Sequence, residues 1–429
     1  MKKTYVFLLS LLICETVFSQ TDWIWFHNDF GYNFPSDTIL AVTSYDYSDE
    51  PTIAGTANGL VAFDDASFTI YDTSNSILLD NKINCLSYYT SFFPVESQWI
   101  GTGKGICKWN FSSEWQCYTT QNSPLPNDSI TAITLGNSLG GIWIGTVNGL
   151  VHFDEDSTWT IYDTDNSGLP SNKVQCLLFV GNGLYVGTDK GLAFFNDSVW
   201  YVKNTFNSGL PSDDITAVSM WSGKLWIGTR SSGACDSSFT TNEWKYFNTT
   251  NGLSSDSITI IKSDFFNPGT WAMELLIGTM GGGMCFINYS ETITRIVNEV
   301  ENTSFRNVYD ASTNIPYGGW GQEKWTATEK GILFSASYAG ISQVNSESLQ
   351  VSAFFDGNIL NVDYFSDKSE PIMFKISDAI GRSLLTGNIL SQIGSRQLQI
   401  QLSQLPTQVY FLTIETPTNK GTVKVVKPY

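Results

Sequence analysis

Histidine is the residue that the chain most clearly lacks, since its 429 residues include only His27 and His152. A Ser-His-Asp triad and most zinc sites need histidine, so two isolated histidines argue against both. No Cys-x-x-Cys pair occurs, and no phosphate-binding loop or dinucleotide fingerprint is present. We therefore expect no catalytic residue, no metal and no cofactor.

Basic side chains are also scarce. The chain has 23 lysines and arginines against 41 aspartates and glutamates, a net charge of −18. Nucleic-acid binding requires clustered positive charge to neutralise phosphates, so nucleic acid is excluded as an expected partner. An excess of acidic side chains is typical of a protein kept soluble by its charge.

Long apolar runs are absent after the amino terminus, and we therefore expect no transmembrane segment. The chain begins "MKKTYVFLLSLLICETVFSQ", with two lysines, an apolar run and small residues near a cut after Ser19. This pattern predicts a secretory signal peptide over residues 1–19. A lipoprotein modified at Cys14 ranks second, because Ile13 stands where a small residue is normally needed.

One phrase of the sequence occurs seven times. Its glycine falls at positions 55, 101, 145, 187, 228 and 278, and Ala327 takes its place in the seventh copy. The spacing of 41 to 50 residues, with short strands in each copy, predicts a β-propeller built from four-stranded blades. The copies are "IAGTANGL" at 53, "WIGTGKGI" at 99, "WIGTVNGL" at 143, "YVGTDKGL" at 185, "WIGTRSSGA" at 226, "LIGTMGGGM" at 276 and "WTATEKGI" at 325.

Residues 171–203 show the parts of one blade, which we name strands A to D from the centre outward. "KVQCLLF" predicts strand A, "LYVGT" strand B, "GLAFF" strand C and "SVWYVK" strand D. The glycine that joins B to C, here Gly191, is expected to adopt a positive φ in a tight turn. Phrases such as "NSGLPSN" connect strand D to the next strand A. Tryptophans on B and aromatic pairs on D are expected to fill the gaps between blades.

These motifs resemble the two-component regulator propeller repeat over roughly residues 21–340. The resemblance implies a propeller of the kind found in extracytoplasmic sensor halves of bacterial hybrid histidine kinases and in secreted proteins. The second propeller, membrane span and kinase of the sensors do not occur here. Streptogramin lyase-like propellers are also similar, but neither histidine suits their catalysis, because His27 lies on a predicted outer strand and His152 on strand C.

Seven blades require a strand from the amino terminus. The seventh copy supplies strand A near Phe305–Asp310, B at Lys324–Thr328 and C at Gly331–Ser335, and "WIWF" at 23 precedes the first blade as an unmatched strand D. Joining them hides an open sheet edge. The competing strand D is "GISQVN" at 340.

The last eighty residues alternate apolar and polar side chains, which predicts a small immunoglobulin-like β-sandwich. "ISDAIGR" at 376, "LSQLPTQVYFLTI" at 402 and "KVVK" at 424 resemble the carboxy-terminal sorting domain of the Bacteroidetes type IX secretion system. The resemblance implies the secretion machinery as a partner and an exported or surface-attached protein. The expected organisation is a signal peptide at 1–19, a propeller at 20–345, a linker at 346–350 and the sorting domain at 351–429. The sorting motif comprises Asp378, Gly381, Tyr410, Lys424 and Lys427.

Cys107 and Cys117 are expected to face each other across the C–D hairpin of the second blade. Cross-strand neighbours lie within disulfide range, and two thiols that only pack against each other are equally compatible with the pattern. Cys85 and Cys176 occupy one repeat position in different blades and should not pair.

A binding surface is expected where the A–B loops meet, because these loops vary in length and are rich in aromatic residues. The alternative is that the rings fold inward as lids over the blade cores. The favoured function is a non-catalytic binding protein for an extracellular glycan or protein. Clustered acidic residues lining the channel would favour a secreted polysaccharide lyase or hydrolase. A neighbouring gene for a kinase or a receptor would favour a sensor subunit. The candidate residues are Phe92, Phe93, Trp221, Phe265, Phe266, Trp271, Tyr317 and Trp320.

Overall fold

In the computed structural model the described residues form β-strands, and a short 3₁₀ turn lies at Thr249–Asn251. No helix long and apolar enough to cross a membrane occurs among the residues that the structure describes. The described residues are 24–26, 34–44, 51–64, 67–89, 97–111, 114–136, 141–154, 158–181, 183–196, 198–238, 243–267, 272–300, 303–314, 321–338, 342–345, 349–356, 359–366, 371–378, 383–390, 394–401, 409–415 and 420–426.

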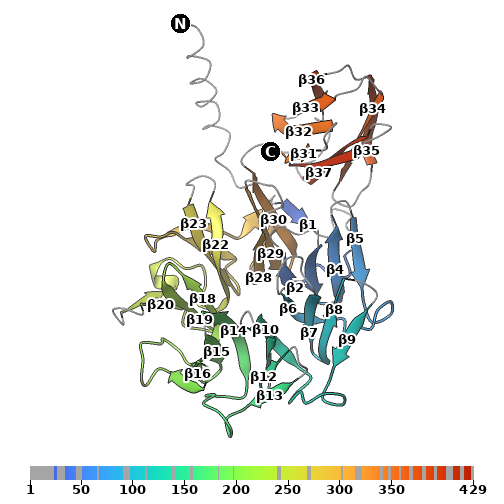
Figure 1. The fold of residues 1–429 in the computed structure, drawn as a ribbon. Coiled ribbons are helices and arrows are strands. Elements are labelled where there is room, and N and C mark those ends of the chain that lie inside the picture. The colour runs from blue at the N-terminus through green and yellow to red at the C-terminus, as the bar shows by residue number, and fades with distance from the viewer. Residues whose placement is uncertain are drawn as a thin grey trace.

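Seven four-stranded antiparallel sheets form the blades of a propeller, with strand A innermost and strand D outermost (Figure 1). The predicted seven-bladed fold is confirmed.

The strands of six blades follow one another in the chain. Blade 1 comprises β2 (Ile39–Thr43), β3 (Thr52–Thr56), β4 (Gly59–Asp64) and β5 (Ser67–Tyr71). Blade 2 comprises β6 (Ile83–Tyr89), β7 (Ser97–Thr102), β8 (Gly105–Trp109) and β9 (Trp115–Tyr118), and blade 3 comprises β10 (Ile130–Leu135), β11 (Ile142–Thr146), β12 (Gly149–Phe153) and β13 (Trp159–Tyr162). Blades 4 to 6 comprise β14 (Val174–Val180), β15 (Gly183–Thr188), β16 (Gly191–Asn196) and β17 (Val199–Lys203); β18 (Ile215–Trp221), β19 (Lys224–Thr229), β20 (Ala234–Ser238) and β21 (Trp244–Phe247); and β22 (Ile258–Asn267), β23 (Ala272–Thr279), β24 (Met284–Ile287) and β25 (Ile293–Val297).

Blade 7 contains the two ends of the propeller. Its strands are β28 (Val308–Asn314), β29 (Gly321–Thr328), β30 (Gly331–Tyr338) and, as strand D, the amino-terminal β1 (Ile24–Phe26). β1 pairs with β30 in antiparallel register, Trp25 opposite Leu333, as the sequence predicts. A hairpin of β26 (Glu299–Val300) and β27 (Thr303–Ser304) lies between blades 6 and 7 in the chain.

The inner strands of blades 7 and 1 are also joined at this closure. The Asp310 carboxylate accepts a hydrogen bond from the Val42 backbone N–H at 3.0 Å. Ser312 accepts one from the Ser44 backbone N–H at 3.1 Å, and the two serine hydroxyls lie 2.9 Å apart. The ring therefore closes both at its rim and at its centre.

The glycine of the repeated phrase is a packing residue, because the next blade presses directly against it. A Cβ atom on Gly101 would lie 2.7 Å from Ile130 Cγ2 of blade 3 and 2.5 Å from Cys85 Sγ. The corresponding glycines of the other copies meet the first residue of the next strand A in the same way: Gly55 with Ile83, Gly145 with Val174, Gly187 with Ile215, Gly228 with Ile258 and Gly278 with Val308.

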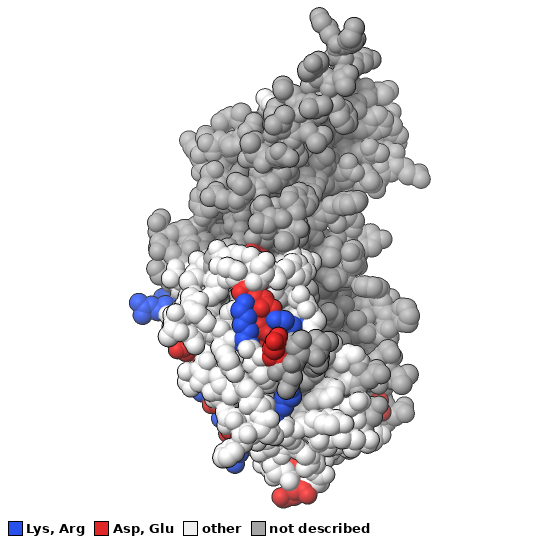
Figure 2. Space-filling model, turned by 90° about the vertical axis from the view of Figure 1, so that its left-hand side faces the viewer, with Lys and Arg blue, Asp and Glu red and all other residues white. Residues whose placement is uncertain are grey.

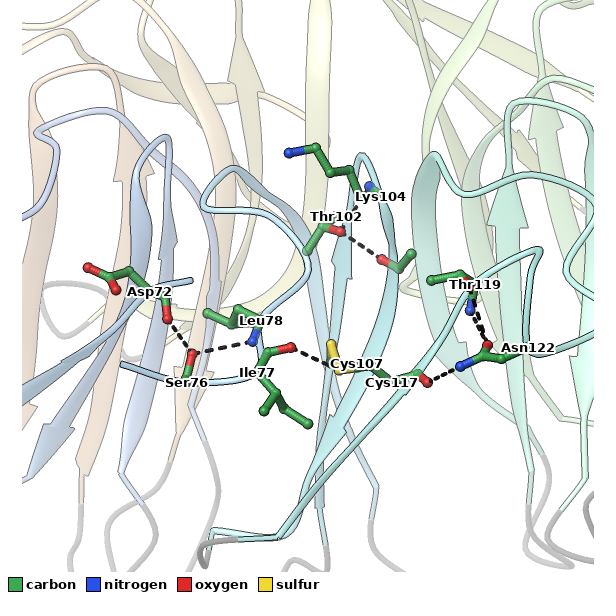
Figure 3. Close-up of a disulfide and its surroundings, with 11 residues drawn as sticks. Asp72, Ser76, Ile77, Leu78, Thr102, Lys104, Cys107, Cys117, Thr119 and Asn122 are labelled. Carbon is green, nitrogen blue, oxygen red and sulfur yellow. Dashed lines mark hydrogen bonds between the residues drawn. A yellow bond between two sulfur atoms is a disulfide. The ribbon is translucent and has the colours of Figure 1, made fainter. Parts of the chain in front are cut away.

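The threonine that follows this glycine fixes the B–C turn. The buried Thr102 hydroxyl donates to the Gly105 carbonyl at 2.8 Å and accepts from the Lys104 N–H at 3.1 Å (Figure 3). Gly105 has φ +134°, a conformation that residues with a Cβ rarely adopt. The same threonine-to-glycine bond recurs at Thr146, Thr188, Thr229, Thr279 and Thr328.

The D–A connections satisfy their polar groups internally. Asn122 accepts a bond from the Thr119 N–H at 2.7 Å and donates to the Cys117 carbonyl at 3.0 Å (Figure 3). In the stretch "DTDNSG" the Asp163 carboxylate accepts the backbone N–H groups of Asp165 and Asn166, each at 2.9 Å. This carboxylate therefore fixes the turn by accepting two backbone N–H groups.

Aromatic side chains fill the space between blades, as predicted. Tyr162 of blade 3 contacts Phe195 and Trp200 of blade 4 with ring centroids 5.4 and 5.7 Å apart. Trp143 lies 5.9 Å from the same Phe195 ring in an edge-to-face arrangement. Such contacts bury large apolar areas and give each blade face a specific partner.

Cys107 and Cys117 occupy opposite positions on β8 and β9 and are joined by a disulfide, while the thiols of Cys85, Cys176, Cys235 and Cys285 are free. At the same cross-strand position blade 3 has Val151 and Ile161. The disulfide therefore takes the place of an apolar pair, and the Cys117 sulfur lies 3.4 Å from the Ile77 carbonyl oxygen (Figure 3).

The carboxy-terminal strands form two four-stranded sheets, ordered β31-β32-β33-β36 and β35-β34-β37-β38, and β31 and β32 lie against β38. Leu360, Val362, Ile376 and Leu412 are fully buried in this domain. The strands are β31 (Ser342–Asn345), β32 (Leu349–Asp356), β33 (Ile359–Ser366), β34 (Pro371–Asp378), β35 (Ser383–Leu390), β36 (Gly394–Gln401), β37 (Val409–Glu415) and β38 (Lys420–Val426).

Two predicted domain limits need correction. β31 pairs with β32, so residues 342–345 belong to the second domain and not to a propeller ending at 345. β32 begins at Leu349, inside the linker predicted at 346–350. "GISQVN" thus contributes its strand to the sandwich, because strand C of blade 7 already has β1 as its neighbour.

Candidate functional site

The predicted aromatic surface differs from the structure where it can be compared. Trp221 is only 4% exposed, so it is a buried residue and not part of an exposed platform. Phe265 and Phe266 lie on β22, paired with Glu274 and Met273, and not in a loop. The other predicted positions lie outside the described residues: Phe92, Phe93, Trp271, Tyr317 and Trp320.

Trp221 is buried because the A–B connection of blade 5 is a two-residue turn. Ser222 and Gly223 both have positive φ, 51° and 72°, which is the conformation of a tight hairpin. The turn is too short to carry the indole outward. The ring instead meets Trp226 edge to face at 5.9 Å and stacks on Tyr289 at 5.0 Å, with 19° between the planes.

Tyr289 is an exposed aromatic residue next to Trp221. It lies in the C–D connection of blade 6, between β24 and β25, and is 55% exposed. Its ring covers Trp221 of blade 5, so the two blades jointly build an aromatic stack that reaches the surface. The sequence reasoning missed Tyr289 because it considered only the A–B loops.

Charged side chains surround this stack. Lys224 Nζ lies 3.0 Å from Asp236 Oδ1 and also contacts the Glu291 carboxylate. Lys245 Nζ lies 3.0 Å from Glu291 Oε2 and donates to the Glu291 carbonyl at 3.0 Å. Figure 2 shows charged side chains of both signs gathered amid uncharged surface on the left-hand side of the Figure 1 view, where blades 5 and 6 lie.

The electrostatics of this network follow from burial. Burial raises the pKa of the Asp236 carboxyl above its ordinary value, although the hydrogen bond from Lys224 opposes that rise. Glu291 also experiences some burial, but its bonds to Lys224 and Lys245 hold its pKa below the ordinary value. Burial would lower the pKa of Lys224, and its two acidic partners raise it instead. The ion pairs therefore favour the charged forms of Glu291 and Lys224.

Three buried polar atoms of blade 5 have no hydrogen-bond partner among the residues that the structure describes: Asp236 Oδ2, Trp221 Nε1 and Trp226 Nε1. The backbone of Glu291 is strained, because a residue other than glycine rarely adopts its φ of 55°. Unpaired buried groups and backbone strain are costly, and such costs concentrate at functional sites. We name Lys224, Asp236, Lys245, Tyr289 and Glu291 the blade 5–6 cluster.

A weak sequence signal could have indicated the cluster. Asp236 faces Trp226 across β19 and β20. At this repeat position blade 2 has Lys108 over Trp99, and blade 3 has His152 stacked on Trp143 at 4.3 Å. The residue at this position varies between blades, with Ala62 in blade 1 and phenylalanine in blades 4, 6 and 7, and blade 5 is the blade that has an acid there.

At the centre of the ring, the inner strand β28 carries a half-buried acid, Asp310. Burial raises the pKa of this carboxyl, and nearby Lys262 and the N–H groups of Val42 and Ala311 oppose the rise. No group of three or more His, Cys, Asp or Glu side chains able to hold a metal occurs among the described residues. His152 lies on strand C of blade 3, as predicted, and His27 lies outside the described residues.

Parts of the predicted sorting motif lie on neighbouring strands. Asp378 at the end of β34 pairs with Tyr410 of β37. Lys424 lies on β38, opposite Phe411 of β37. Gly381 and Lys427 lie outside the described residues.

Residues 357–428 match the family described as a secretion system C-terminal sorting domain. A comparison with curated proteins found no match. Among solved structures, the extracellular domain of a putative hybrid two-component system of B. thetaiotaomicron is 14% identical with a TM-score of 0.57; the alignment covers 95% of this chain and 58% of that one. PorZ, a surface component of the type-IX secretion system of Porphyromonas gingivalis, is 13% identical with a TM-score of 0.53 and coverage of 91% and 59%.

An inactive variant of virginiamycin B lyase from Staphylococcus aureus is 13% identical with a TM-score of 0.54, and the alignment covers 74% of this chain and 99% of that one. At these identities the similarities show the propeller fold. The chain spans less than two thirds of the B. thetaiotaomicron domain and of PorZ. The sorting domain, in contrast, is a sequence match and specifies a secretion route. The chain is thus a propeller protein with a type IX secretion C-terminal sorting domain, exported to the cell surface or the extracellular space.

Proposed function

We propose that the chain is a non-catalytic binding protein of the cell exterior, whose propeller presents the blade 5–6 cluster to an extracellular glycan or protein. The observation that carries this proposal is the exposed Tyr289, stacked on Trp221 beside the Lys224–Glu291–Lys245 network. Rigid aromatic groups next to fixed charges are typical of recognition sites.

The opposite face of the ring is a weaker candidate. It carries the D–A and B–C connections, whose side chains form the recurring turn bonds of Thr102 and Asn122. Residues that a blade needs for folding recur from copy to copy. The blade 5–6 cluster instead departs from the repeat, which favours a role beyond architecture.

Binding explains the cluster better than catalysis does. The Glu291 carboxylate is held by two lysines, and its pKa is lowered, whereas a general acid needs a raised pKa. The pKa of Asp236 is raised, but its side chain is only 2% exposed. Neither carboxyl is therefore poised to transfer a proton to a substrate at neutral pH.

The test is a binding survey with the exported protein, using a glycan array and a panel of purified surface proteins. We expect a specific ligand whose binding is lost in Tyr289→Ala. The control is Tyr201→Ala, which removes a similarly exposed tyrosine (57%) from the outer strand β17 of blade 4. A ligand that binds Tyr289→Ala as tightly as the wild type would refute this placement, and turnover of a bound glycan would refute the non-catalytic role.

A further inference from the structure

We infer that the blade 5–6 cluster recognises an uncharged sugar residue, stacked on Tyr289 and hydrogen-bonded to Glu291 and Lys245. This inference rests on the proposed function and names the class of its ligand. It is carried by three features of the cluster: an aromatic ring with one free face, polar groups fixed on both sides, and balanced charge.

The aromatic ring is supported from below. One face of Tyr289 stacks on Trp221, and Trp221 is wedged against the fully buried Trp226. With 55% of Tyr289 exposed, its outer face is directed toward solvent. The flat, apolar C–H face of a pyranose ring matches such a surface, and the supported ring loses little conformational freedom when a ligand binds.

The polar groups are held in place before any ligand arrives. A carboxylate offers about four acceptor positions and an ammonium three donors. The Glu291 oxygens each contact one lysine, which leaves acceptor positions for further donors. The buried Asp236 carboxylate anchors Lys224 from beneath at 3.0 Å. Sugar hydroxyls both donate and accept, and they match this mixture of fixed donors and acceptors.

The charges argue against an acidic glycan. Two lysines stand against two carboxylates in the cluster, so it has no net positive charge to attract sulfate or uronate. The whole chain has a net charge of −18, which repels polyanions at longer range. An uncharged sugar needs no net positive charge at the site and is not repelled by the negative charge of the chain.

The experiment measures binding of neutral oligosaccharides, and of sulfated and uronate-containing ones, to the full exported chain by calorimetry. We expect a neutral ligand and an affinity loss of about tenfold or more in Tyr289→Ala, the loss typical of an aromatic anchor. Tyr289→Phe should bind within about threefold of the wild type, because it keeps the stacking face. Tyr201→Ala should bind normally, and thermal unfolding of each variant checks its folding.

Each other outcome overturns a distinct statement. A preference for sulfated or uronate glycans would overturn the neutral class. A protein ligand lost in Tyr289→Ala would overturn the sugar inference and leave the proposed function standing. A neutral glycan that binds Tyr289→Ala normally would overturn the site. The absence of any ligand from both surveys would overturn the proposed function together with the inference.

Discussion

At the scale of single residues, the repeated phrase combines two different requirements for glycine. Gly101 has no side chain because Ile130 of the next blade occupies the space beside it. Gly105 has none because the turn needs φ +134°. Between them Thr102 ties the turn to the strand. The motif recurs in each blade because packing and turn geometry require it. These two requirements account for its glycines and its threonine.

Gly101→Ala should destabilise the propeller by about 1–3 kcal/mol, the usual cost of overpacking a rigid interior. The added methyl group would lie 2.5 Å from Cys85 Sγ and 2.7 Å from Ile130 Cγ2, and the next blade would have to shift. The control is Gly103→Ala, where the nearest atom is Asp80 Oδ2 at 3.4 Å. Urea unfolding of both variants measures the difference; equal stabilities would contradict the packing role.

At the scale of the element, the C–D hairpin of blade 2 uses a disulfide where blade 3 uses Val151 and Ile161. The crosslink spans 10 residues in sequence, for which loop-closure entropy gives about 2–3 kcal/mol. The four free thiols are different, because burial raises their pKa values, that of Cys176 to about 12. They should remain unreactive in the folded protein near pH 8.

Reduction of the wild type should lower its free energy of unfolding by about 2–3 kcal/mol. The double variant Cys107→Val, Cys117→Ile restores the apolar pair of blade 3, and its stability should not respond to reductant. Thiol titration provides the second check: the unfolded exported chain should show four thiols before reduction and six after it. Six thiols before reduction would exclude the disulfide.

At the scale of the whole molecule, stability depends on closing the ring. Blade 7 is assembled from β28, β29 and β30 near the end of the propeller and from β1 at its start. Without β1, strand β30 would expose an unpaired edge, and open edges promote association between molecules. The propeller should therefore behave as one cooperative unit that includes residues 24–26.

Deletion of residues 20–26 from the mature chain should lower the free energy of unfolding by more than about 1 kcal/mol and increase self-association. Thermal unfolding and size-exclusion chromatography measure the two effects. A deletion of equal length from the carboxy terminus is no substitute, because it alters the sorting domain. Replacement of residues 20–23 alone is the matched control. Full stability and a monomeric state after the deletion would contradict closure by β1.

The inner closure should respond to pH through Asp310. Burial raises the pKa of this carboxyl, so the folded state takes up its proton at a higher pH than the unfolded chain does. The free energy of unfolding should therefore rise as pH falls from neutrality through the folded pKa of Asp310. The rise should end near the unfolded value of 3.8, where both states bind the proton.

Asp310→Asn removes this titration and keeps an acceptor for one of the N–H groups of Val42 and Ala311. Relative to this variant, the wild type should gain stability as pH is lowered from 7 toward 4, and urea unfolding across that range measures the gain. Parallel stability curves for the two proteins would show that the carboxyl is not shifted. The control is a substitution of Gln98, a buried residue of blade 2 that does not titrate. This substitution should leave the pH dependence of stability unchanged.

The sequence by itself determined the blades, their turns and the amino-terminal closure. Each of these depends on residues a few positions apart, such as Thr102 and Gly105, or on a repeat that can be counted. Only the tertiary structure decided the burial of Trp221, the transfer of β31 to the second domain and the blade 5–6 cluster. Lys224 and Glu291 are 67 residues apart and meet because adjacent blades are rotated about the ring axis, which no local pattern encodes. Contacts between blades depend on that rotation, whereas strands and turns depend on the local chain.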